Sequence, residues 1–162
     1  MTRALAFPQN LELARFFEGP IQAWGMVVDG KGRVRRRFRA DIVGRKDEAK
    51  LVLDESFLFD DGERDSRVWT ICEADGELRG SAEDVLGEAC GELRGAILHW
   101  NYEMFASVGS RKVKVCFNDW VVQVDQDVML ARADIRKFGF RVGEVILDFI
   151  RPQSNTVIAS EK

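Results

Sequence analysis

The chain has 162 residues, of which 46% are hydrophobic and 31% are charged, and these values are typical of a folded globular protein. The composition excludes disorder over most of the chain, and the length favours one domain with a substantial core over two. The formal net charge of −3 lacks the basic excess that nucleic-acid-binding proteins usually carry.

The N-terminal residues predict a short helix and no export signal. The apolar patch Ala4–Phe7 is too short for a signal peptide, and no lipobox cysteine is present, so we expect a cytoplasmic protein. Asn10 is a candidate N-cap for a helical turn over Leu11–Phe17, which Gly19–Pro20 would end. Three scattered cysteines without a CxxC pair suit a reducing compartment, where we expect them to act as small packing residues.

From residue 21 onwards, strand-like segments alternate with turn residues. Asp29–Gly30, Asp60–Gly62 and Asp75–Gly76 are typical of hairpin turns, and the glycine-rich segment 87–95 is interpreted as a turn or a bulged strand. The other expected strands are Ile21–Val28, Arg33–Val43, Leu51–Phe59, Glu63–Glu73, Leu78–Val85, Ala96–Ala106, Lys112–Val124, Asp127–Lys137 and Phe140–Ile150.

Regularly spaced strands with short connections predict an all-β fold. Parallel strands need long crossovers, for which the chain has no room, so we expect an antiparallel up-and-down β-barrel of eight to ten strands with a short N-terminal helix. The expected boundaries are an N-terminal segment at 1–19, the barrel at 20–151 and a polar tail at 152–162.

No residue pattern typical of catalysis or metal binding is present. The single histidine, His99, alternates with Trp100 and Tyr102, so we expect it to face solvent if these aromatic side chains face inward. It has no histidine partners for a metal site, and no G-x-S-x-G motif marks a nucleophile. We therefore predict no catalytic residue, no metal and no cofactor.

Two arginines share predicted strand faces with large apolar side chains: Arg67 with Trp69, and Arg132 with Leu130. A buried arginine is costly unless it is paired. Three acidic residues are candidate partners: Asp119, Asp84 and Glu55. Two interpretations stay open. In the structural one, the arginines form an internal arginine–aspartate network or lie at a rim that water reaches. In the functional one, an arginine inside the cavity binds the carboxylate or phosphate of a ligand.

A stripe of arginines occupies one face of the second strand: Arg33, Arg35, Arg37 and Arg39. We interpret it as the solvated face of an edge-like strand, and the alternative is peripheral contact with anionic lipid headgroups or an acidic partner. Nucleic acid is not expected, because no stacking aromatic residues interleave with these arginines. No run of eighteen apolar residues exists, so we expect no membrane span.

Several motifs together resemble the bacterial family known as domain of unknown function 3833, over about residues 11–151. The motifs are Phe16–Gly25, Phe57–Gly62, Arg67–Trp69, Phe117–Trp120 and Lys137–Val145. The resemblance implies no particular activity. Many members look like lipoproteins, and this sequence lacks their acylated cysteine. The segment Gly19–Trp24 is similar, with different spacing, to the glycine-x-tryptophan corner of lipocalins, which by analogy implies a calycin-like barrel.

The inward-facing residues that alternation predicts would form an apolar pocket. They are Trp24 or Met26, Phe38, Phe57, Trp69, Trp100, Tyr102 and Phe117. Such pockets suit fatty acids, isoprenoids and related lipids, so we expect a soluble protein that binds a hydrophobic small molecule without catalysis. We predict Trp69, Trp100, Tyr102 and Phe117 as its walls, and Arg67 and Arg132 as anchors for a head group.

Two other functions stay open. One is a barrel enzyme that isomerises or cyclises a lipid-like substrate, for which a residue such as Asp119, Asp84 or Tyr102 needs a shifted pKa inside the cavity. The other is a protein-interaction module whose barrel is packed solid and whose working surface is the arginine stripe or a sheet edge.

Overall fold

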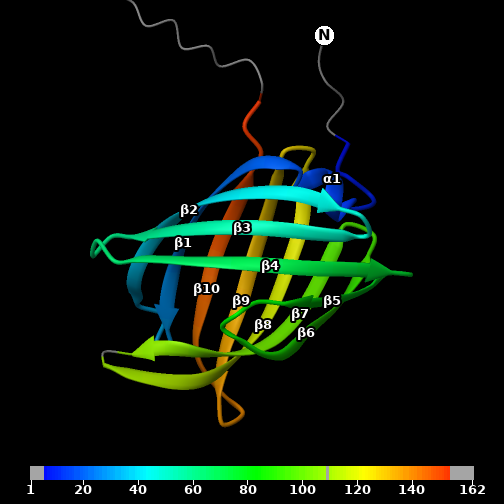
Figure 1. Cartoon of the computed structure of the whole chain (residues 1–162). Helices are drawn as coiled ribbons and strands as arrows, with labels where there is room; N and C mark the ends of the chain where they lie inside the picture. The colour runs from blue at the N-terminus through cyan, green and yellow to red at the C-terminus, as the bar shows by residue number, and fades with distance from the viewer. Residues whose placement is uncertain (1–5, 109, 154–162) are drawn as a thin grey trace, which may run out of the picture.

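The computed structural model describes residues 6–108 and 110–153, and the strands in these residues form one closed barrel (Figure 1). Each strand pairs antiparallel with its neighbours in sequence, and β1 pairs with β10 to close the sheet. The predicted up-and-down β-barrel is therefore confirmed. The elements are α1 Leu13–Phe16, β1 Gly19–Asp29, β2 Val34–Asp47, β3 Lys50–Phe59, β4 Arg64–Ala74, β5 Glu77–Ser81, β6 Val85–Arg94, β7 Ile97–Val108, β8 Arg111–Asp125, β9 Val128–Lys137 and β10 Phe140–Ile150.

The glycine-rich segment is a strand, and the strand before it is shorter than predicted. β5 ends at Ser81 instead of Val85, because residues 82–84 turn the chain into β6. β6 carries the expected bulge, since its register with β7 shifts between Leu86 and Cys90. Gly91 is required here, because a Cβ atom at this position would lie 2.4 Å from the carbonyl oxygen of His99.

The N-terminal segment covers one end of the barrel (Figure 1). Its helix α1 begins after Glu12 and not after Asn10, so the predicted cap is wrong, and Glu12 makes no side-chain capping bond. Tertiary contacts hold the segment instead. The Leu11 N–H donates to the carbonyl oxygen of Gly95 at 2.8 Å, and Arg151 donates to the Phe16 carbonyl at 3.0 Å. Hydrophobic burial adds to these contacts, since Leu11, Leu13, Phe16 and Phe17 all belong to the core.

Gly44 in β2 decides whether this segment can dock. A Cβ atom at Gly44 would lie 1.5 Å from the carbonyl oxygen of Phe17, so Gly44→Ala must displace the backbone of the segment. We expect it to lower the free energy of unfolding by about 2 kcal/mol, as overpacking commonly does. Gly30→Ala is the matched control, because its Cβ would meet nothing closer than 3.5 Å. Urea unfolding compares the two, and equal stabilities would contradict the docking.

Strand alternation divides the side chains between interior and surface. In β1 the interior side chains are Ile21, Ala23 and Val27, so neither Trp24 nor Met26 points inward, and Trp24 is 45% exposed.

The three cysteines are exposed and do not act as packing residues: Cys72, Cys90 and Cys116. Most of the predicted polar tail lies outside the described residues. Within those residues, no helix has the length and apolar character needed to cross a membrane.

Candidate ligand-binding cavity

The barrel encloses a cavity of about 800 Å³. Leu13 and Phe17 border it at the end that α1 covers, and Phe59 and Val142 border it toward the opposite end, where the β3–β4 and β9–β10 hairpins lie. The walls between these ends are mainly apolar, and every interior aromatic residue predicted from β2 onwards lines them: Phe38, Phe57, Trp69, Trp100, Tyr102 and Phe117. The interior is therefore not packed solid.

The four predicted wall residues form one aromatic group. The ring of Trp69 in β4 lies edge-on to Trp100 and Tyr102 of β7, with centroids 5.7 and 5.2 Å apart, and Tyr102 stacks on Phe117 of β8 at 5.1 Å. The ring of Trp100 extends over β5 and β6 to contact Trp69. It passes close to Gly80 and Gly91, where a Cβ atom would lie within 3 Å of the ring. The glycines of these two strands thus make room for a tryptophan inside the barrel.

A group of polar side chains projects from the walls into this apolar interior, and we call it the interior polar cluster. Its members are Glu55 of β3, Arg67 of β4, Asp84 of the β5–β6 loop, Tyr102 of β7 and Asp119 of β8. Arg67 donates from Nε and Nη2 to the Asp84 carboxylate at 2.8 to 3.0 Å. Of the three candidate partners, Asp84 is therefore the one that pairs with Arg67, as an internal arginine–aspartate network requires.

Burial raises the pKa values of three members of the cluster: Glu55, Tyr102 and Asp119. It raises the pKa of Glu55 to about 7, although the charge of Arg67 opposes this shift. Burial likewise raises the pKa of Asp119 to about 7 against a hydrogen bond from Tyr102, and it raises the pKa of Tyr102 well above 10. Burial disfavours the charge of Arg67, but its hydrogen bonds to Asp84 and the surrounding negative groups leave its pKa raised. Near neutral pH the cluster thus contains two carboxyl groups that are partly protonated.

Asp119 has an incomplete set of hydrogen bonds. Its Oδ1 atom is shielded from solvent and has no hydrogen-bond partner within the described structure. The residues paired with Asp119 in register are Trp100 on β7 and Ala133 on β9, and neither donates a hydrogen bond to Oδ1. An unpaired buried acceptor of this kind is costly, because the group has lost its water without gaining a replacement.

Arg132 borders the cavity, but it lies apart from the other predicted site residues. It is exposed between buried Ala131 and Ala133, so alternation places its side chain on the outer face of β9 and leaves its backbone at the cavity wall. There it is in register with Trp120, which is 43% exposed. The same outer face carries His99, which stacks on Trp120 at 4.1 Å and contacts Asn118, so the predicted outward orientation of His99 is confirmed.

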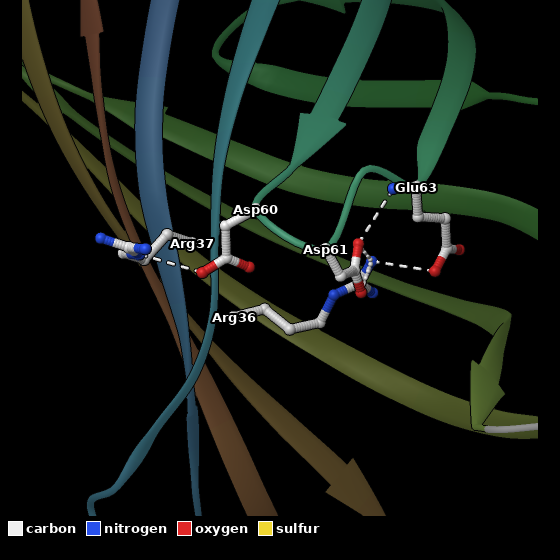
Figure 2. Close-up of polar contacts among 5 residues, drawn as sticks. All are labelled: Arg36, Arg37, Asp60, Asp61 and Glu63. Atoms are coloured by element: carbon white, nitrogen blue, oxygen red, sulfur yellow. Dashed lines mark hydrogen bonds and ion pairs between the residues drawn. The ribbon is translucent and has the colours of Figure 1, made fainter.

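Charged residues hold the β3–β4 turn against β2 at the end of the barrel opposite α1 (Figure 2). Arg36 contacts Asp61 and Glu63 at 3.3 and 3.0 Å, and its guanidinium lies 3.6 Å from the ring centroid of Phe59. Arg37 bonds Asp60 at 2.9 Å on the outer side. Since Arg36, Phe59 and Glu63 also line the cavity, this turn forms part of its rim.

Three of the four arginines in the stripe pair with two neighbouring carboxylates, which neutralise about half of its charge. Arg33 and Arg35 both donate to Asp29, at 3.0 and 2.7 Å, and Arg37 pairs with Asp60. Exposed ion pairs of this kind contribute little to stability, but they reduce the charge that would attract anionic lipids.

The sequence indicated Glu55 only as a possible partner of arginine, although this residue lines the cavity. A signal for its position exists in β3, where Glu55 alternates with Leu53 and Phe57 and therefore shares their inward face. Asp84 offers no such signal, because it lies in a loop where alternation does not apply.

Comparison with solved structures identifies the barrel as calycin-like. A protein of unknown function from the DUF3598 family of Nostoc punctiforme has a TM-score of 0.68 at 12% identity over 93% of this chain. The match covers 53% of that protein, so this chain spans about half its length. The S-type phycobiliprotein lyase CPES from Guillardia theta has a TM-score of 0.66 at 10% identity, over 88% of this chain and 92% of the lyase. At such identities the likeness shows the fold alone.

The sequence itself identifies the family. No curated protein matches it. The family model described as "Protein of unknown function (DUF3833)" matches residues 5–151, which is nearly the whole chain and includes every strand of the barrel. The chain therefore belongs to the DUF3833 family.

Proposed function

We propose that this protein binds a hydrophobic, lipid-like small molecule inside its barrel, without changing it chemically. The observation that carries this proposal is the cavity of about 800 Å³ with mainly apolar walls, a size and lining typical of small-molecule sites. The likeness in fold to a phycobiliprotein lyase supports a barrel that handles a small molecule. In this proposal Trp69, Trp100, Tyr102 and Phe117 contact the ligand, while Arg67 organises the interior polar cluster.

Filling part of the cavity is expected to weaken the binding of such a ligand. Both residues border the cavity, but Ala131 is buried and Arg132 is exposed, so alternation makes Ala131→Phe and Arg132→Phe place the same side chain inside and outside the barrel. Native mass spectrometry after incubation with dodecanol, dodecanoate or retinol measures uptake. We expect Ala131→Phe to weaken binding by at least about tenfold, the equivalent of about 1.4 kcal/mol, and Arg132→Phe to bind like the wild type.

Two outcomes of this experiment would contradict the proposal. One is a wild-type protein that takes up none of the three compounds and carries none after purification. The other is equal uptake by Ala131→Phe and Arg132→Phe, which would place the binding site outside the barrel. Thermal unfolding of both variants shows whether each remains folded.

A second candidate, a barrel enzyme of the isomerase type, is favoured by one observation. Asp119 and Glu55 border the cavity with pKa values of about 7, close to the optimum for a general acid or base at neutral pH. Organic extraction of the bound ligand distinguishes the two functions. A compound recovered as an isomer of the compound that was added supports the enzyme, and recovery of the added compound unchanged supports binding alone.

A further inference from the structure

The one cation of the interior polar cluster is already engaged. The Nε and Nη2 groups of Arg67 both donate to Asp84, and Nη2 also lies 3.6 Å from the sulfur of Met104. The cluster as a whole contains three carboxyl groups for this one guanidinium: Glu55, Asp84 and Asp119. A ligand carboxylate or phosphate placed here would find the one guanidinium already paired with Asp84, and its negative charge would further disfavour ionisation of Glu55 and Asp119.

Asp119, unlike Arg67, has a polar atom without a hydrogen-bond partner. Its Oδ1 atom is buried without a donor, while the residue as a whole borders the cavity. The torsion about the Cβ–Cγ bond of aspartate is soft, so a small rotation can turn this oxygen toward a ligand. The groups that act on Asp119 are Tyr102 from β7, Arg67 from β4 and Glu55 from β3, and none of them satisfies Oδ1. A hydrogen-bond donor on the ligand is therefore the missing partner.

We infer that the ligand is an apolar molecule that carries an N–H or O–H donor, and that Asp119 accepts this donor inside the barrel. The inference rests on the proposed function and narrows its ligand class. The polar group of the ligand is then a hydrogen-bond donor bound by Asp119, and not the anionic head group bound by Arg67 that the sequence predicted. A hydrogen bond made to a buried acceptor that is otherwise unpaired strengthens binding by about tenfold, so the donor determines which apolar molecules the cavity prefers.

Four probes with the same twelve-carbon chain separate these ligand classes: dodecanol, dodecylamine, dodecyl methyl ether and dodecanoate. Quenching of tryptophan fluorescence reports binding, because Trp69 and Trp100 line the cavity. We expect dodecanol or dodecylamine to bind at least about tenfold more tightly than the ether, which lacks only the donor, and dodecanoate to bind no more tightly than the ether. Whether the alcohol or the amine binds best shows whether the donor is neutral or cationic.

Variants of Asp119 test the residue itself. Asp119→Leu removes the acceptor and is expected to abolish the preference for the donor probes while the ether still binds. Asp119→Asn keeps one acceptor oxygen and is expected to retain part of the preference for dodecanol, which keeps the test informative if the leucine variant does not fold. Asn118→Leu, the same change on the outer face of β8, is the control and is expected to preserve the wild-type order.

The outcomes distinguish this inference from the proposed function. Equal binding of dodecanol, dodecylamine and the ether by the wild type would overturn the role of Asp119 and leave cavity binding intact. Tightest binding of dodecanoate would overturn the ligand class in favour of an anion. Failure of all four probes to bind would overturn both proposals.

Discussion

Replacing Glu55 with glutamine is expected to stabilise the protein by about 3 kcal/mol at pH 8 and to change its stability little at pH 4. Glu55 is only 8% exposed, and burial raises the pKa of its carboxyl group from 4.5 to about 7. One pKa unit corresponds to about 1.4 kcal/mol, so the ionised form of this carboxyl costs about 3 kcal/mol in the folded state. Glutamine has nearly the same shape and never ionises.

The sign of the pH dependence follows from proton counting. Between pH 4.5 and about 7 the folded protein holds a proton on Glu55 that the unfolded chain has already released. The contribution of Glu55 is therefore fully present below pH 4.5 and is lost as the pH rises through 7. Asp119 acts in the same direction, because its pKa is also raised to about 7. Glu55→Gln should reduce the decline in stability without removing it.

Urea unfolding between pH 4 and pH 8 measures this effect. Glu73→Gln is the matched control, because Glu73 lies on the same sheet with its side chain exposed to water. We expect its stability to follow the wild type within about 0.5 kcal/mol at every pH, as is usual for surface substitutions. A Glu55→Gln variant with the wild-type pH profile would show that Glu55 does not hold a proton in the folded barrel.

Arg67→Met is expected to lower the free energy of unfolding by about 3 kcal/mol at neutral pH. Methionine preserves most of the apolar stem, so the change removes mainly the charge and its hydrogen bonds. Asp84 would then be left without its bidentate partner, and Glu55 and Asp119 would lose the positive charge that opposes the rise in their pKa values. Breaking a buried ion pair costs about 3 to 5 kcal/mol, and the partial exposure of Asp84 places this pair at the lower limit.

Two comparisons make the Arg67 result specific. Arg39→Met changes an exposed arginine on the outer face of β2 and is expected to alter stability by less than about 0.5 kcal/mol. The double variant Arg67→Met with Asp84→Leu is expected to recover part of the loss, because no charge is left unpaired between these two positions. An Arg67→Met protein of wild-type stability that no longer binds dodecanoate would instead identify Arg67 as a ligand anchor.

The amino-acid sequence by itself determined the topology of this protein. Turn residues such as Asp29–Gly30 and Asp60–Gly62 separate segments of alternating polarity, and hairpins this short leave only an antiparallel meander. Alternation also grouped Trp100 with Tyr102 on one face, which lines the cavity as expected. Both predictions rest on local geometry, because turn conformation and the two-residue period of a strand depend on neighbouring residues alone.

Which face of a strand lies inside was decided only by closure of the barrel. In β1 and β9 both faces carry apolar side chains, so the sequence favoured Trp24 and Arg132 as interior residues, whereas the pairing of β1 with β10 and of β9 with β8 places them outside. A shift of one residue exchanges the two faces, and only the register of the closed sheet selects between them.

The partners of the buried charges were likewise decided by the tertiary structure. Arg67 meets Asp84 across a loop whose conformation no alternation predicts, and Asp119 is left with a free oxygen by the walls that surround it. Sequence alone indicated that a buried arginine needs a partner, but not which one. The physical reason is that hydrogen bonding inside a barrel joins strands that are far apart along the chain, and it depends on distances that only the folded wall sets.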